Sequence, residues 1–165
     1  MRTYNHRNCK SLFGYAASAH AKSRGRCQLC DCGGPPLDFD LWRQFTIEHI
    51  IPRSQGGHLK SIRASVSSRF PNLSAEEQGS LAKRLDEANT VSACGFCNST
   101  TSHTASEKSM DELLNEASGN IDSVAAHVEK YIHVVLRRKR EDVQWKLASV
   151  KTAFEVAIRP QLDNK

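Results

Sequence analysis

The sequence lacks the features that would place it in a membrane or outside the cell. It contains no apolar run of membrane length, and its basic N-terminus is not followed by the apolar segment of a signal peptide. Internal repeats and low-complexity linkers are also missing. We therefore expect a soluble, cytoplasmic protein whose 165 residues form one domain with a modest core.

Acidic residues are missing from two stretches, which is more informative than the net charge of +5. The first 30 residues contain six basic side chains and no acid, and residues 49–75 form a second basic, acid-free stretch. Residues 104–165 carry ten basic and ten acidic residues, so the whole excess lies before them. Positive charge concentrated in this way suits a polyphosphate ligand, with a solvated basic surface as the alternative. The expected DNA-contacting residues are Arg2, Arg7, Arg24, Arg26 and Arg53.

Cysteine is the residue type with the clearest pattern. Four of the six cysteines form two Cys-x-x-Cys pairs, namely Cys27, Cys30, Cys94 and Cys97. In a reducing cytosol two such pairs predict a closed, tetrahedral structural zinc site that joins two distant segments, whereas buried reduced thiols are the alternative. Cys9 is isolated and Cys32 follows the first pair closely. We interpret both as packing residues or free thiols, with Cys32 as the substitute if one of the four is not a ligand.

Hydrophobic spacing and turn signals give a coarse map of the first hundred residues. Ser74 and Glu77 form a capping box, which predicts the start of a helix. Residues 58–73 are rich in Ser and Arg, which favours a loop. The predicted order is a helix over 11–23, one or two strands over 37–50, a loop over 58–73, a helix over 75–88 and a strand over 89–94.

The last third is predicted to be helical throughout. A second capping box at Ser109 opens a helix that ends at Gly119. Apolar residues then recur at helical spacing over 121–135 and over 143–158, and Pro160 ends the pattern. The intervening segment RRKRED contains no Gly or Pro, which favours one continuous helix and leaves its four basic residues available to DNA phosphates.

The segment FTIEHIIPRSQGG, residues 45–57, places polar residues where a strand ends. Apolar and β-branched residues lead up to Glu48 and His49, and turn residues follow them. A carboxylate is a ligand for a hard divalent cation, and an imidazole that titrates near neutrality accepts a proton from water. The pair therefore suits hydrolytic chemistry.

The order of motifs along residues 27–98 resembles that of the HNH nucleases. It runs from the first cysteine pair through Glu-His-Ile-Ile-Pro and Gly-Gly to Asn89, and then to the second pair, which Asn98 follows directly. The resemblance implies an α+β fold in which a zinc-stapled ββα-metal core lies between an N-terminal helix and long C-terminal helices. The chain then divides into a basic arm and helix (1–26), a nuclease core (27–105) and a helical region (106–165).

The resemblance also implies roles for single residues. Glu48 and Asn98 bind one Mg²⁺ or Mn²⁺, His49 is the general base, and Asn89 positions the loop of His49 through backbone hydrogen bonds. The implied activity is hydrolysis of double-stranded DNA to 5′-phosphate and 3′-hydroxyl ends, with a restriction or defence role. Because one such site cuts one strand, we expect a homodimer.

The sequence departs from the family pattern in three places. Glu48 stands where many members have Asp, the segment between Gly57 and Asn89 is long, and no lysine follows Asn98 within a few residues. His58 and His103 lie near the motifs, and for each a solvated histidine and a contact to phosphate or metal both fit the pattern.

Two further functional classes compete with a restriction-type nuclease. A zinc-dependent nucleobase deaminase requires His-x-Glu before a Pro-Cys-x-x-Cys segment, and this order does not occur. A non-catalytic, zinc-stapled DNA-binding module fits the charge and the cysteines but gives no reason for Glu48, His49, Asn89 and Asn98 to occur together. Within the nucleases, a phage or mobile-element nicking enzyme remains an alternative.

Overall fold

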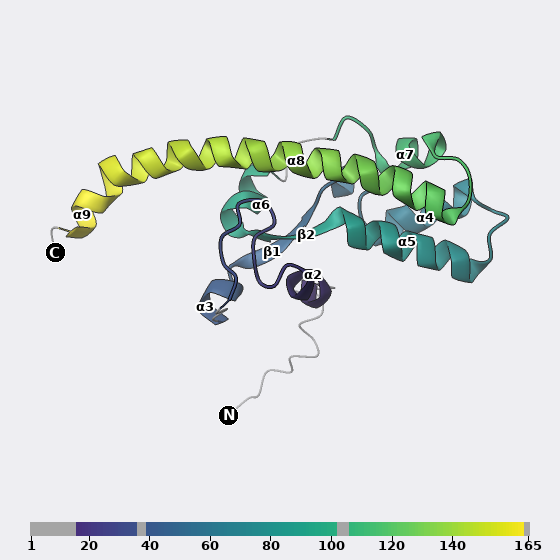
Figure 1. The fold of residues 1–165 in the computed structure, drawn as a ribbon, viewed down its shortest axis with the longest axis horizontal. Helices are drawn as coiled ribbons and strands as arrows, with labels where there is room; N and C mark the ends of the chain where they lie inside the picture. The colour runs from purple at the N-terminus through teal and green to yellow at the C-terminus, as the bar shows by residue number, and fades with distance from the viewer. Residues whose placement is uncertain (1–15, 36–38, 102–105, 164–165) are drawn as a thin grey trace, which may run out of the picture.

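The computed structural model describes residues 16–35, 39–101 and 106–163, and it is mostly helical with one small sheet (Figure 1). The α+β prediction is confirmed at this level. No helix in the described ranges is long and apolar enough to cross a membrane. The first elements in chain order are α2 (Ala16–Lys22), α3 (Phe39–Trp42), β1 (Phe45–His49), η2 (Arg53–Gln55), α4 (Leu59–Arg69) and α5 (Ala75–Asn89). They are followed by β2 (Thr90–Cys94), α6 (Gly95–Thr101), α7 (Met110–Glu116), α8 (Ile121–Ala153), η3 (Phe154–Ile158) and α9 (Arg159–Asp163).

The two strands pair in antiparallel register, with Phe45 opposite Cys94 and His49 opposite Thr90. Among the described residues 39–50, one strand rather than two forms, because α3 occupies residues 39–42. Helices α4 and α5 are inserted between the strands, and α6 follows β2 without a loop and contacts both strands. The site residues on β1 therefore lie beside the helix that carries Asn98.

The prediction of a loop over residues 58–73 is wrong, because α4 occupies most of this segment. Ile62 and Val66 are fully buried one turn apart, and Leu59 and Phe70 pack against the core on either side. This narrow apolar face suffices for a helix that packs against α5 and α7, while Arg63, Ser67, Ser68 and Arg69 are exposed.

The two capping boxes predicted from sequence are both present. Ser74 accepts a hydrogen bond from the backbone N–H of Glu77 at the start of α5, and Ser109 accepts one from Glu112 at the start of α7. Helix α5 runs to Asn89, one residue beyond the prediction, so β2 begins at residue 90. Helix α7 ends before Gly119.

Helix α8 is continuous through the segment RRKRED, as its lack of Gly and Pro predicts. It packs against α5, α6 and α7, and its buried residues extend to Val143 within one hydrophobic core that also contains Cys27 and Phe45. The prediction that Pro160 ends the helix is wrong. The helix passes through a π-helical turn, η3, and Pro160 lies in the first turn of α9, where its missing N–H is tolerated.

The C-terminal end of this helical rod extends past the rest of the molecule (Figure 1). Several large apolar side chains along it are exposed, namely Trp145, Val150, Phe154, Val156, Ile158 and Leu162. The described residues therefore leave an apolar helix surface without a covering element.

Candidate functional site

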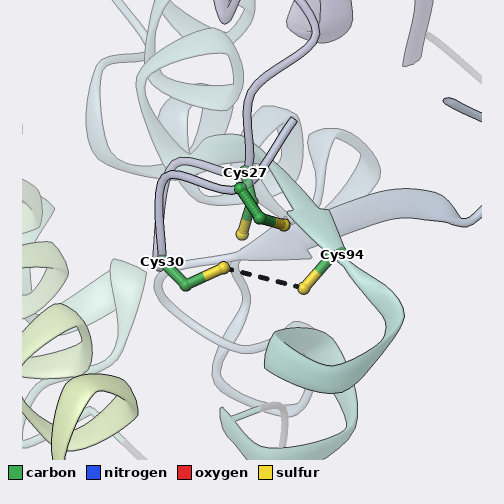
Figure 2. Close-up of side chains that lie close together, drawn as sticks. Cys27, Cys30 and Cys94 are labelled. Carbon is green, nitrogen blue, oxygen red and sulfur yellow. Dashed lines mark hydrogen bonds between the residues drawn. The ribbon is translucent and has the colours of Figure 1, made fainter. Parts of the chain in front are cut away.

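A cluster of cysteines lies where the N-terminal segment meets the end of β2 (Figure 2). The sulfur atoms of four of them lie within 4.8 Å of one another, and the Sγ atoms of Cys30 and Cys94 are 3.9 Å apart. A tetrahedral zinc site with bonds of about 2.3 Å has sulfur–sulfur edges of about 3.8 Å, so these thiols fit a zinc ion. The four members of this cysteine cluster are Cys27, Cys30, Cys32 and Cys94.

Cys97, the remaining cysteine of the predicted set, is fully buried in α6 and adjoins this cluster. Its thiol shares hydrogen bonds with Cys27 and Cys94, which raise the pKa of Cys97. The hydrogen bonds from Cys94 and Cys97 lower the pKa of Cys27 in turn. Five thiols therefore gather at one place, and the structure adds Cys32 to the four that the sequence predicts. Cys9 lies outside the described residues.

A hairpin of residues 26–33, here called the cysteine hairpin, fixes the first pair against the sheet. Arg26 and Gly33 form its bridge, and the N–H of Cys27 donates to the carbonyl of Cys32 at 2.8 Å. Gln28 donates its N–H to the carbonyl of Ser92 at 2.8 Å and accepts the N–H of Ser92 on its side chain at 3.0 Å. Both backbone groups of Ser92 thus point away from β1, so the hairpin lies on the opposite edge of β2.

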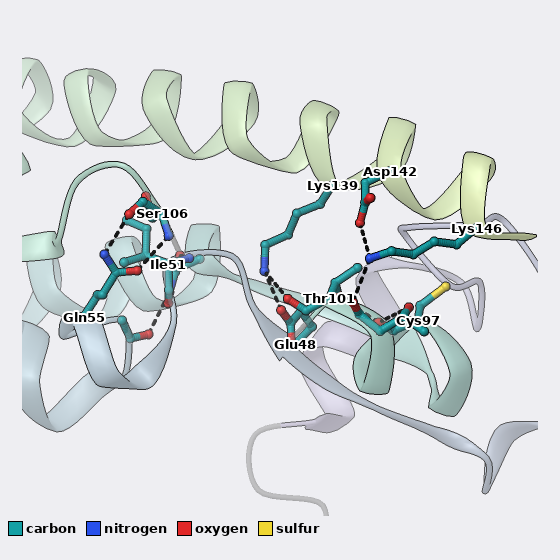
Figure 3. Close-up of polar contacts among 12 residues, drawn as sticks. Glu48, Ile51, Gln55, Cys97, Thr101, Ser106, Lys139, Asp142 and Lys146 are labelled. Carbon is teal, nitrogen blue, oxygen red and sulfur yellow. Dashed lines mark hydrogen bonds and ion pairs between the residues drawn. The ribbon is translucent and has the colours of Figure 1, made fainter. Parts of the chain in front are cut away.

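Glu48 and His49 end β1, and their environments differ. Glu48 is 4% exposed, and its Oε1 accepts a hydrogen bond from the ammonium of Lys139 at 2.6 Å (Figure 3). His49 is half-buried. Burial, followed by the positive charges of Arg53, His58 and Lys139, lowers the pKa of His49 to about 4. Its imidazole is therefore neutral at physiological pH and is able to accept a proton.

Asn89 is fully buried at the junction of α5 and β2, and its side chain holds the loop that follows His49. Its Oδ1 accepts the N–H of Ile51 at 2.7 Å, and its Nδ2 donates to the carbonyls of Ile51 at 3.0 Å and Gly57 at 2.7 Å. A side chain at position 57 has no room, because a Cβ there would lie 1.7 Å from the carbonyl oxygen of Ile51. The loop is thus fixed at both ends by one amide.

Asn98 is half-buried in α6, one helical turn before Thr101. Cationic side chains of α8 satisfy the last carbonyls of this helix. The ammonium of Lys139 donates to Thr101 at 3.3 Å, and that of Lys146 donates to Thr100 at 3.0 Å (Figure 3). Positive charge at a helix C-terminus is favourable, so α8 holds α6 in place beside β1.

The arginines predicted to contact DNA are exposed where the structure describes them. Arg53 lies in η2 and its charge acts on His49. Arg24 is also exposed, and Arg26 forms an exposed ion pair with Asp31 at 3.6 Å on the cysteine hairpin. Arg2 and Arg7 lie outside the described residues, as does His103.

His58 precedes α4 and adjoins the site. It lies close enough to His49 for an electrostatic interaction, and its Nδ1 is buried with no hydrogen-bond partner among the described residues. A cleft of about 560 Å³ opens between α2, α4 and α5 and reaches Thr90, the residue opposite His49 in the sheet. Three cations, Lys22, Arg63 and Lys83, and two acids, Asp86 and Glu87, line it. Lys22 from the first acid-free stretch and Arg63 from the second therefore line the same cleft.

Lys139 is the residue at this site that the sequence interpretation missed. The expectation that all four basic residues of RRKR face DNA phosphates is wrong for Lys139, which is 3% exposed. Arg138 forms an exposed ion pair with Glu107, and Arg140 donates to the carbonyl of Gln28 at 2.6 Å. A signal was present, because position 139 falls on the buried stripe of α8, between Leu136 and Val143.

Comparisons with known proteins do not extend this picture. No family model, curated protein or solved structure matches the chain significantly.

Proposed function

We propose that this protein is a divalent-metal-dependent HNH endonuclease that hydrolyses DNA phosphodiester bonds to 5′-phosphate and 3′-hydroxyl ends. The observation that carries the proposal is the Glu48–His49 pair at the end of a strand, beside a helix next to a cysteine cluster that could hold a zinc ion, with the next loop held by Asn89. The resemblance of the motif order to HNH nucleases supports the same reading.

His49 is the general base in this proposal. A neutral imidazole takes the proton of the attacking water, and a positioned general base contributes about 10²- to 10⁴-fold to a rate. Asn89 acts through the backbone, because its amide fixes the loop after His49 and with it the direction of the imidazole. Arg53, exposed and close enough for its charge to act on His49, pairs with a DNA phosphate.

Glu48 and Asn98 supply the oxygen donors for one Mg²⁺ or Mn²⁺, the type of ligand that hard cations prefer. The buried carboxylate of Glu48 fits this role because its oxygen already accepts a hydrogen bond from a cationic group. When bound, the divalent ion neutralises charge on the scissile phosphate and on the departing 3′-oxygen. The zinc ion remains structural, because a site closed by four thiolates leaves no position for water.

The test is cleavage of plasmid DNA by the zinc-loaded protein with added Mg²⁺ or Mn²⁺. His49→Ala is expected to lower the cleavage rate by about 10²- to 10⁴-fold while zinc content and DNA affinity stay unchanged. His133→Ala, which removes an exposed histidine of α8, is the matched control and is expected to cut normally. A folded His49→Ala protein that cuts at the wild-type rate contradicts the proposal.

A non-catalytic, zinc-stapled DNA-binding module is the second candidate, and the Glu48–Lys139 ion pair is the observation that favours it. An ammonium bound to the carboxylate satisfies the charge without a metal. Wild-type protein that binds the plasmid but leaves it intact with Mg²⁺ or Mn²⁺ would establish this reading. Among nucleases, linear product indicates a restriction or defence enzyme, and nicked circles indicate a nicking enzyme.

A further inference from the structure

The ion pair between Glu48 and Lys139 joins two side chains that are both almost completely buried. The ammonium lies 2.6 Å from Oε1 of Glu48 and 3.3 Å from the carbonyl oxygen of Thr101. Figure 3 shows the lysine reaching from α8 down to the end of β1 and to the C-terminal end of α6. A segment 91 positions away in sequence thus supplies a cation to the candidate site.

Lys139 stands on an otherwise apolar stripe of α8, where burial of a charge is costly unless it is paired. Its partners are a carboxylate and a helix C-terminal carbonyl, which are the two groups that best compensate a buried cation. The neighbouring Lys146 binds the carbonyl of Thr100 and the carboxylate of Asp142 on its own helix, and Arg140 binds the carbonyl of Gln28. Of these three cations of α8, Lys139 is the one placed on Glu48.

We propose that Lys139 is the resident counter-ion of Glu48, and that its ammonium and a divalent cation compete for this carboxylate. The inference rests on the proposed function in one respect, the assignment of Glu48 as a metal ligand. A doubly charged ion on Glu48 repels an ammonium held against the same carboxylate, so binding of the ion requires the lysine to leave.

The helix itself is anchored during such an exchange. Val143 is fully buried, and Arg140 and Lys146 tie α8 to the cysteine hairpin and to α6. The flexible four-carbon stem of Lys139 is what moves. The chain therefore keeps its buried carboxylate neutralised in both states, by its own lysine before metal loading and by the divalent ion afterwards.

The experiment is a titration of the zinc-loaded, full-length protein with Mn²⁺, followed by the electron paramagnetic resonance signal of free Mn²⁺. Lys139→Met is expected to bind Mn²⁺ at least about tenfold more tightly than the wild type, because a competing charge is removed. Lys130→Met, which removes an exposed lysine of α8 away from the site, is the matched control and is expected to bind like the wild type. Glu48→Gln is expected to remove the tight site in either background.

A melting experiment guards against a variant that folds poorly. Without metal, Lys139→Met removes a cationic partner of a buried carboxylate, so its melting temperature is expected to fall and to recover with Mn²⁺ more than that of the wild type. If Lys139→Met does not fold with Mn²⁺, Lys139→Gln replaces it in both measurements.

Unchanged or weaker Mn²⁺ binding in the folded variant overturns the competition, and weaker binding makes Lys139 a residue that orients Glu48. These outcomes are separable from failure of the proposed function. A wild-type protein that cuts DNA while the variants show no gain in Mn²⁺ affinity refutes only the competition. Tighter Mn²⁺ binding in variants of a protein that never cuts DNA refutes only the nuclease.

Discussion

Asn89 shows how much a single buried side chain supports. Its amide satisfies three backbone groups of the loop after His49, and no other residue type of similar size offers both the acceptor and the two donors used here. The same loop is held from another side, where Gln55 exchanges two hydrogen bonds with the backbone of Ser106. Positioning of His49 thus depends on amide side chains.

We expect Asn89→Ala to lower the free energy of unfolding by about 2–4 kcal/mol, because it leaves buried backbone groups of Ile51 and Gly57 without partners. Urea denaturation measures the change. Asn72→Ala, in an exposed turn, is the control and should change stability little. Equal stability of the two variants would mean that the loop is held by other contacts.

Residues differ in how far sequence alone reveals them. Glu48 and His49 stand out because turn residues follow a β-branched run, a local signal. The resemblance implies backbone hydrogen bonds from Asn89, and the structure contains them. The partner of Glu48 was not predicted, because the contact with Lys139 spans 91 positions and a basic run normally indicates a solvated face.

At the scale of elements, α5 positions one residue of the site, because it ends at Asn89 and leads directly into β2. Its first turn is fixed by the carboxylate of Glu77, which accepts hydrogen bonds from the hydroxyl and the N–H of Ser74 at 2.7 and 2.8 Å. These bonds lower the pKa of Glu77 in the folded protein. Their contribution to stability is therefore present above the pKa of Glu77 in the unfolded chain, and it is lost as pH falls through the lower pKa of the folded state.

We expect Ser74→Ala to destabilise the protein by about 1 kcal/mol at neutral pH, the usual cost of removing an N-cap. The difference from wild type should shrink in acid, once Glu77 is protonated and the hydroxyl no longer binds a carboxylate. Urea midpoints at a series of pH values test this, with Ser80→Ala in the exposed part of α5 as the control. A pH-independent difference would argue against the role of Glu77.

Sequence rules predicted helix starts correctly where the capping residues lie next to the helix in sequence. The capping boxes of α5 and α7 place both helix starts correctly, because the side chains that satisfy the first N–H groups are adjacent in sequence. Helix α4 was missed because Ile62 and Val66 give it only a narrow buried face among many Ser and Arg residues. The prediction that Pro160 ends the helix failed because Pro160 follows the π-helical turn η3 and lies in the first turn of α9, where a proline is tolerated.

For the whole molecule, the cysteine cluster joins the cysteine hairpin to the end of β2 and to α6, and a zinc ion bound there would have five thiols for four ligand positions. We predict that Cys27, Cys30, Cys94 and Cys97 hold the ion, because Cys97 is buried against Cys27 whereas Cys32 is exposed. Elemental analysis should then find zinc in Cys32→Ser and a loss of zinc, with a lower melting temperature, in Cys97→Ser. The reverse result would assign Cys32 as the fourth ligand.

The exposed apolar side chains at the end of the helical rod lead to the prediction of a homodimer. We expect Val150→Glu to shift light scattering from dimer to monomer, because it places a charge among Phe154 and Ile158, whereas Thr152→Glu on the opposite face should not. A substitution at Leu147 would be a poorer test of the dimer interface, since this side chain packs against the core of its own chain. A wild-type monomer at micromolar concentration, with and without DNA, would contradict the prediction.

The distance in sequence between Glu48 and Lys139 has a consequence for synthesis. A ribosome adds about 5–20 residues per second, so the strand with Glu48 and His49 leaves the exit tunnel seconds before the helix that carries its lysine. The carboxylate has its counter-ion only when α8 has been made and docked. A nascent chain that has reached β2 therefore cannot complete the buried ion pair, and α8, synthesised after both strands, supplies the residue that completes the centre begun by β1.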